Sequence, residues 1–219
     1  MTVIQGEMEY KQTEIGKSMK GLYIVTPDWD DTAKMVEITE KALKGGAEIV
    51  QYRHKTATPE LRKEQAGALQ ALCRRYGKPF IINDFVELCL ELDTDGIHVG
   101  GTDAPVKKVR AAVGPGKIVG ASCYGDIELA RKATRDGASY VAFGGFYPSR
   151  VKKYPVTQNI VSDWKKEMPS MPVCVIGGMN VDNATPLVKL GADMVAVVSG
   201  VYFQEDPEKV AGQFAALFG

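Results

Sequence analysis

The stretch GGAEIVQYRHKTATPELRKEQAGALQALCRRYGKPFIIND, residues 45–84, holds one complete structural unit and the start of the next. Its apolar run Glu48–Tyr52 predicts a short strand, and the amphipathic residues 58–76 predict a helix after a polar loop. Gly77 stands just past that helix, with Arg75 in the last turn, as is typical of helix C-termini. A second apolar run, Phe80–Asn83, follows directly. The order is therefore strand, loop, helix, glycine and strand.

The same order repeats along the chain from residue 21 onward. Eight apolar runs are predicted as strands: Leu22–Thr26, Glu48–Tyr52, Phe80–Asn83, Gly96–Val99, Ile118–Ala121, Tyr140–Phe143, Val173–Ile176 and Met194–Val198. Because these runs are nearly all apolar, both faces should be covered, as in a parallel sheet wrapped by helices. Eight such units favour an α/β fold of the compact (β/α)8 TIM-barrel type over an open doubly wound sheet.

The unit between Asn83 and Gly96 is the shortest and leaves room for about two helical turns, so a small helix is expected there. We expect no second domain, linker or low-complexity stretch in this sequence. We expect one catalytic barrel domain over residues 21–219. Residues 1–20 are polar and are expected to form an N-terminal extension, packed on the outside or mobile.

The composition is that of an ordinary globular protein. Of 219 residues, 45% are hydrophobic and 25% are charged, and 27 basic residues balance 27 acidic ones. A zero net charge provides no global field for nucleic acid or an anionic membrane. No apolar run approaches the roughly 20 residues that span a bilayer, and residues 1–20 lack the apolar core of a signal peptide. We expect a cytoplasmic protein, and the sequence leaves open whether it forms a homo-oligomer.

Cysteine and histidine spacing does not indicate a zinc site. The cysteines are scattered, without a CxxC pair, and are interpreted as buried thiols: Cys73, Cys89, Cys123 and Cys174. His98 lies within a predicted strand and is interpreted as a hydrogen-bonded interior residue. His54 stands between two cations and either belongs to the loop or faces a ligand.

Reactive groups of such a barrel lie at the C-terminal ends of its strands. Arg53 and Lys55 follow the second strand and are two residues apart, so an extended chain projects both the same way. A guanidinium beside an ammonium suits a polyphosphate or carboxylate ligand. The alternative is an ordinary solvated basic loop.

Two carboxylates follow neighbouring strands, Asp84 after the third and Asp103 after the fourth. Together they suit Mg²⁺, which is usually held by one or two carboxylates and by ligand phosphate oxygens. The alternatives are that Asp84 caps the following helix and that Asp103 is a turn residue before Pro105.

Glycine-rich ends of the last strands indicate a phosphate site. Gly177-Gly178 and Ser199-Gly200 stand where many barrels bind phosphate through backbone N–H groups, although each pair also suits a plain turn. The loop after the sixth strand is longer than usual, which favours a functional role for Lys152 within it.

Taken in order, the strand ends resemble the thiamine phosphate synthase (thiamine-phosphate pyrophosphorylase) family over residues 21 to about 205. The matching elements are Gln51-Tyr52-Arg53-His54-Lys55, Ile82-Asn83-Asp84, His98 to Asp103, Gly120-Ala121-Ser122, Phe143 to Lys152, Ile176-Gly177-Gly178 and Val198-Ser199. The resemblance implies a Mg²⁺-dependent transferase of thiamine biosynthesis. It would join 4-amino-2-methyl-5-hydroxymethylpyrimidine diphosphate to 4-methyl-5-(2-phosphoethyl)thiazole and release thiamine phosphate and diphosphate.

The resemblance also implies a role for each matching residue. The catalytic groups that bind the diphosphate would be Arg53, Lys55, Ser122 and Lys152, and the metal ligands would be Asp84 and Asp103. Gln51 and Asn83 would contact the pyrimidine. The thiazole phosphate would lie against Ser149, Gly178, Val198 and Ser199. The chain departs from the family pattern at Gly101, where glutamine is common, and at Ser149 and Val151, which replace two threonines. Val151 removes one hydroxyl donor to the thiazole phosphate.

Three other functions compete with this one. A related thiazole tautomerase carries histidine two positions after the serine of the fifth strand, where this chain has Tyr124. A non-catalytic phosphate-binding barrel would not need a metal site beside diphosphate ligands. A sugar-phosphate epimerase would need zinc ligands on several strands. The pair Asp84 and Asp103 favours the synthase.

Overall fold

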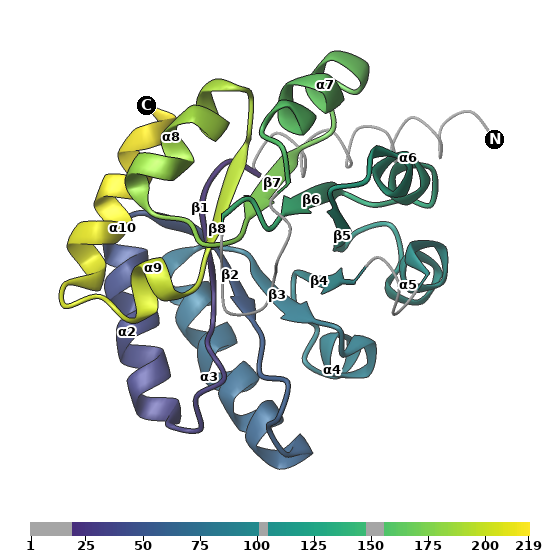
Figure 1. Ribbon diagram of the computed structural model, residues 1–219. Helices are drawn as coiled ribbons and strands as arrows, with labels where there is room; N and C mark the ends of the chain where they lie inside the picture. The colour runs from purple at the N-terminus through teal and green to yellow at the C-terminus, as the bar shows by residue number, and fades with distance from the viewer. Residues whose placement is uncertain (1–18, 101–104, 148–155) are drawn as a thin grey trace.

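The computed structural model describes residues 19–100, 105–147 and 156–219. Eight parallel strands close into a barrel in the order β1-β2-β3-β4-β5-β6-β7-β8. Figure 1 shows the strands at the centre and the helices around them. The predicted (β/α)8 barrel is therefore confirmed.

The predicted strands all occur, with bounds close to those expected. They are β1 (Gly21–Val25), β2 (Ala47–Tyr52), β3 (Phe80–Asn83), β4 (Gly96–Val99), β5 (Ile118–Tyr124), β6 (Tyr140–Gly144), β7 (Val173–Ile176) and β8 (Met194–Val197). The helices of the described residues are α2 (Thr32–Lys44), α3 (Pro59–Tyr76), α4 (Val86–Glu91), α5 (Val106–Val113), α6 (Ile127–Arg135), α7 (Asn159–Glu167), α8 (Val181–Lys189), α9 (Ser199–Tyr202), α10 (Pro207–Ala215) and the 3-10 helix η1 (Ala216–Phe218). The small helix expected between Asn83 and Gly96 is α4.

Local sequence signals set the ends of α3. The hydroxyl of Thr58 accepts a hydrogen bond from the Leu61 amide, and Pro59 occupies the first turn, where its missing N–H costs nothing. Gly77 ends the helix in the left-handed conformation, with φ of 62°. A residue with a Cβ would be strained there.

Alternation along each strand separates two layers of side chains. Leu22 and Ile24 of β1 pack in the layer between sheet and helices, whereas Tyr23 and Val25 point into the barrel. Met19, only 2% exposed, packs with the inner layer. The rest of the expected N-terminal extension, residues 1–18, lies outside the described residues.

The four cysteines are buried and free, as predicted. Among the described residues, no helix combines the length and apolar character that crossing a membrane requires.

Candidate active site

The barrel brings the predicted site residues to one end. Nine of them lie within or directly after the C-terminal ends of strands: Gln51, Arg53, Lys55, Asn83, Asp84, Ser122, Gly178, Val198 and Ser199. Because all strands of the closed barrel are parallel, these ends share one face. Asp103, Ser149 and Lys152, together with Gly101 and Val151, lie outside the described residues.

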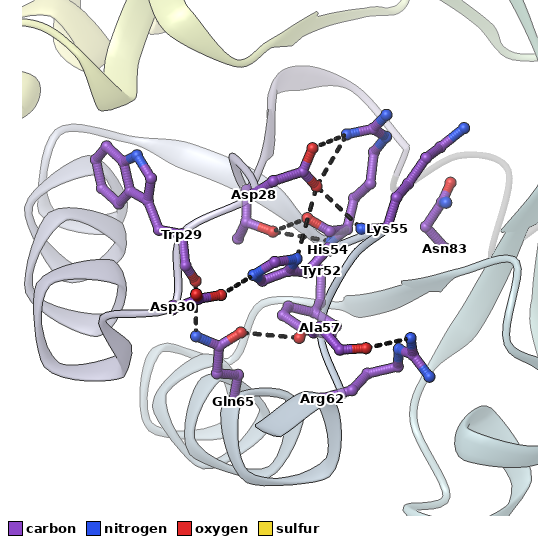
Figure 2. Close-up of polar contacts among 12 residues, drawn as sticks. Asp28, Trp29, Asp30, Tyr52, His54, Lys55, Ala57, Arg62, Gln65 and Asn83 are labelled. Atoms are coloured by element: carbon purple, nitrogen blue, oxygen red, sulfur yellow. Dashed lines mark hydrogen bonds and ion pairs between the residues drawn. The ribbon is translucent and has the colours of Figure 1, made fainter. Parts of the chain in front are cut away.

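The basic loop after β2 is anchored by the end of β1. The Thr26 hydroxyl donates to the Arg53 carbonyl at 3.0 Å and accepts from the Arg53 amide at 2.8 Å. Asp28 accepts from the Lys55 amide at 3.0 Å, and both of its carboxylate oxygens lie 3.4 Å from the Arg53 guanidinium (Figure 2). The loop is therefore held by specific contacts on both sides of its central residue, unlike an ordinary solvated loop.

His54, which stands between Arg53 and Lys55 in the sequence, is buried in the protein interior. Its side chain is 1% exposed, its Nε2 lies 2.8 Å from Asp30 and its Nδ1 lies 3.8 Å from Asp28. The histidine thus belongs to the loop rather than facing a ligand. With His54 turned inward, the Arg53 side chain remains 33% exposed and Lys55 is exposed. Figure 2 shows the Lys55 side chain extending on the side of Asn83.

Asp84 adopts a backbone conformation that is uncommon for a side-chain-bearing residue. Its φ is 65°, its amide donates to the His98 carbonyl at 2.9 Å, and its Oδ2 accepts from the Asn83 side chain at 2.8 Å. The N-cap of α4 is Phe85, without a side-chain cap bond, so the alternative that Asp84 caps this helix is wrong. Left-handed residues other than glycine are concentrated at functional sites.

The donor set at Asp84 fits a hard divalent cation. Asp84 is half-buried at the barrel end, and Asn83 beside it is 9% exposed. The described residues contain no cluster of three or more histidine, cysteine or acidic side chains able to hold a metal ion. Mg²⁺ does not require one, because it commonly keeps water and phosphate oxygens as most of its ligands.

Five side chains from five strands form a hydrogen-bonded chain across the barrel interior. Gln51 Nε2 donates to the Tyr23 hydroxyl at 2.7 Å, and the hydroxyls of Tyr23 and Tyr140 lie 2.8 Å apart. Nδ1 of His98 lies 2.7 Å from the Tyr140 hydroxyl, and its Nε2 lies 2.8 Å from the hydroxyl of Ser122. Burial lowers the pKa of His98 to about 4, so the ring is neutral near pH 7. The prediction of a hydrogen-bonded interior histidine is confirmed.

Gly120 provides the space for this chain. A Cβ at residue 120 would lie 2.1 Å from Cζ of Tyr140 and 2.2 Å from its hydroxyl oxygen. The Tyr140 ring is fully buried and stacks against His98 at a centroid distance of 5.6 Å, so it has little room to move. The glycine of Gly120-Ala121-Ser122 is therefore required by packing.

We expect Gly120→Ala to destabilise the barrel by about 1–3 kcal/mol, because the new methyl group displaces a buried ring. Turnover at 25 °C should fall further than the loss of folded protein explains, since Ser122 loses its hydrogen-bonded neighbours. Urea unfolding and steady-state rates of the folded variant measure the two effects. The control is Gly67→Ala in α3, where the added Cβ meets nothing within 4 Å. Unchanged stability of Gly120→Ala would contradict the packing argument.

The ends of β7 and β8 face the same side of the barrel. Gly177 has φ of 115°, and a Cβ there would lie 2.4 Å from the Gly145 Cα. Gly178, with φ of 62°, and Ser199 are both exposed, whereas Val198 is half-buried. An exposed glycine backbone and an exposed serine side chain at the same barrel end suit a phosphate group.

The sequence interpretation missed Tyr23, Asp28, Asp30 and Tyr140. Asp28 and Asp30 follow the first strand, so the rule that reactive groups lie after strand ends could have found them. Tyr23 and Tyr140 occupy strand positions that face the barrel interior, so alternation was the available signal.

Known proteins resemble this chain over nearly its whole length. Residues 22–201 match the family model described as thiamine monophosphate synthase. A thiamine-phosphate synthase from Janthinobacterium sp. (strain Marseille) is 63% identical over 203 residues, which cover 92% of this chain and 98% of the relative. The Nitrosospira multiformis thiamine-phosphate synthase is 42% identical over 219 residues, covering 99% and 93%.

Solved structures agree with the barrel. A thiamine phosphate pyrophosphorylase from Pyrococcus furiosus has a TM-score of 0.82 and 31% identity, covering 92% of this chain and 96% of that one. A 3-hexulose-6-phosphate synthase has a TM-score of 0.69 at 18% identity, covering 91% and 100%. At that identity the second likeness concerns the fold alone.

Proposed function

The chain belongs to the thiamine monophosphate synthase family, and we propose that it joins 4-amino-2-methyl-5-hydroxymethylpyrimidine diphosphate to 4-methyl-5-(2-phosphoethyl)thiazole, giving thiamine phosphate and diphosphate. The observation that carries the proposal is the anchored pair Arg53 and Lys55 on the same barrel end as Asp84. Cations beside a carboxylate suit a diphosphate together with a divalent metal ion. Small-molecule substrates and a cytoplasmic location belong to the same proposal.

The leaving diphosphate defines the role of the cations. Negative charge develops on the departing oxygen as the C–O bond breaks, and the aminopyrimidine ring carries the resulting positive charge. Protein groups lower the barrier when they bind the transition state, with its developing charge, more strongly than they bind the substrate in its ground state. We assign this role to Arg53, Lys55, Ser122 and Lys152, with Gln51 and Asn83 on the pyrimidine.

Asp84 and Asp103 are the proposed ligands of Mg²⁺. When bound, Mg²⁺ would neutralise charge on the diphosphate oxygens, as in phosphoryl transfer. The half-buried carboxylate of Asp84 supports the assignment, because its Oδ2 is oriented by the Asn83 amide at 2.8 Å. The assignment of Asp103 as the second ligand rests on the sequence resemblance.

The second substrate is proposed to lie near β7 and β8, with its phosphate against Ser149, Gly178, Val198 and Ser199. Two separate anchors would hold the thiazole nitrogen close to the exocyclic carbon of the pyrimidine. Such positioning converts an encounter of two molecules into a reaction within one complex.

Incubation of the purified protein with both substrates and Mg²⁺ tests the proposal, with thiamine phosphate and diphosphate measured as products in equal amounts. Omission of either substrate, or addition of a chelator, should abolish both products. Turnover of the non-aromatic thiazole isomer alone, with no joining reaction, would identify a tautomerase instead. Tight binding of both substrates without product would identify a non-catalytic barrel.

A further inference from the structure

The hydrogen-bonded chain in the barrel interior has two chemically different ends. One end is the amide of Gln51 on β2, and the other is the hydroxyl of Ser122 on β5. Between them stand Tyr23, Tyr140 and His98, each of which is no more than 9% exposed. The contacts that join Gln51, Tyr23, Tyr140 and His98 are buried, so these four groups must satisfy one another, whereas the half-buried Ser122 can also reach a ligand.

The donor at Gln51 sets the direction of every bond that follows. Nε2 can only donate, so the Tyr23 hydroxyl accepts from it, and its own hydrogen goes to its other partner, Tyr140. The Tyr140 hydroxyl then donates to Nδ1 of His98, which must be unprotonated. A neutral imidazole with a bare Nδ1 carries its proton on Nε2, and Nε2–H donates to the Ser122 oxygen.

A doubly protonated His98 does not fit this arrangement. Both ring nitrogens would donate, and the hydrogen of Tyr140 would have to turn toward Tyr23. The hydrogen of Tyr23 would then face the amide donor of Gln51. The contacts alone therefore select the neutral Nε2–H tautomer.

We propose that His98 is a positioning residue whose Nε2–H tautomer holds Ser122 as a hydrogen-bond donor toward the diphosphate, and that Tyr23 and Tyr140 transmit this polarity from Gln51. The proposal deepens the proposed function and rests on it for the identity of the ligand. Ser122 accepts from His98, so its own hydrogen is left for an anionic oxygen. At the other end the Gln51 amide keeps its carbonyl oxygen as the atom that accepts from an amine.

The two ends of the hydrogen-bonded chain therefore differ: Ser122 presents a hydrogen-bond donor to a ligand, and Gln51 presents an acceptor. An anionic oxygen needs the donor at Ser122, and an exocyclic amine needs the acceptor at Gln51. Reversal of the chain would invert both ends at once. One hydrogen-bond direction therefore matches both parts of an aminopyrimidine diphosphate.

Nitrogen NMR of the full-length protein measures the polarity directly. The chain has 2 histidines, so ¹⁵N-histidine labelling gives two ring systems, and His98→Gln identifies the system of His98 by its loss. We expect a pyrrole-type Nε2 and a pyridine-type Nδ1 in the wild type. In Tyr140→Phe the ring should become a mixture of both tautomers. A wild-type ring with its proton on Nδ1, or a charged ring, would overturn the proposal.

Binding of inorganic diphosphate with Mg²⁺ tests the link to Ser122. Calorimetry should show binding weakened about tenfold in Ser122→Ala, as for a hydrogen bond to a charged group, and several-fold in Tyr140→Phe. In the Ser122→Ala background, Tyr140→Phe should have no further effect, because the donor that it positions is already absent. Additive effects would overturn the link and reduce Tyr140 to a packing role.

Tyr202→Phe is the matched control. Tyr202 is also a buried tyrosine, and its hydroxyl lies 2.7 Å from that of Thr39, in the layer outside the barrel. The Tyr202→Phe variant should leave both the His98 tautomer and the affinity for diphosphate unchanged. If the joining reaction were absent but the tautomer were as expected, the synthase proposal would fail while the polarity of the chain remained established.

Discussion

Asp84→Asn is expected to reduce turnover about 100-fold or more, because the variant keeps the shape of the side chain and removes the charge proposed to hold Mg²⁺. Asparagine tolerates the left-handed conformation as aspartate does, so φ of 65° at this position is not newly strained. Half-maximal activity should require a higher Mg²⁺ concentration. Steady-state rates across a Mg²⁺ titration, with thermal unfolding of both proteins, measure these effects.

The chain offers a matched control for this variant in Asp93. Asp93 also has a left-handed backbone, with φ of 50°, but it lies before β4, and its carboxylate pairs with Lys117 at 2.6 Å. Asp93→Asn should leave stability nearly unchanged, because ion pairs of exposed carboxylates contribute little, and it should leave the Mg²⁺ titration unaltered. Equal Mg²⁺ dependence in Asp84→Asn and the wild type would remove Asp84 from the metal site.

The second large effect is expected for Arg53→Gln. Loss of the guanidinium would remove a positive charge from the proposed diphosphate site, and turnover should fall by about 10²–10³-fold, as for other preorganised donors. The fold should persist, because the backbone of residue 53 is held by Thr26 independently of its side chain. Single-turnover rates at saturating substrate separate this loss from weaker binding.

Arg131→Gln serves as the control for charge alone. Arg131 lies on α6, and its guanidinium contacts both carboxylate oxygens of Glu167, at 2.6 and 2.8 Å. Removing it changes the net charge by the same amount without touching the strand ends. A similar loss of activity in both variants would indicate a general electrostatic effect and contradict the assigned role of Arg53.

The fold was predictable because each unit of the barrel is encoded locally. A short apolar run, a capped amphipathic stretch and a terminal glycine follow one another within about 25 residues, so no long-range information is needed to recognise them. The C-terminal end of β5 is harder to predict from the sequence. The apolar pattern predicts a strand over Ile118–Ala121, whereas β5 extends to Tyr124, with an irregular register between Ser122 and Tyr124. Polar residues there obscure the apolar pattern.

For the candidate site, the strand-end rule brings residues from distant parts of the sequence to one barrel end, but it does not predict which side chains contact one another. Arg53 and Lys55 could be paired on one side of a strand by spacing alone. Tyr23 and Tyr140 are separated by 117 residues, and their contact depends on the closure of the barrel. Alternation indicates that a strand residue points inward but not which residue it meets. For Asp84, the alternative interpretation as a helix cap rests on its position before a helix, and the backbone conformation of the residue does not support that alternative.

The position of Asp28 has a consequence for the selection of anions. Its two oxygens lie 3.4 Å from the Arg53 guanidinium, so a ligand meets a cation that already has a counter-ion. A monovalent anion such as chloride gains little by displacing a carboxylate of equal charge. A diphosphate carries several charges, and in the proposed site it would replace Asp28 as the partner of Arg53 while also contacting Lys55. We therefore expect the loop between β2 and α3 to favour ligands with several negative charges over monovalent anions.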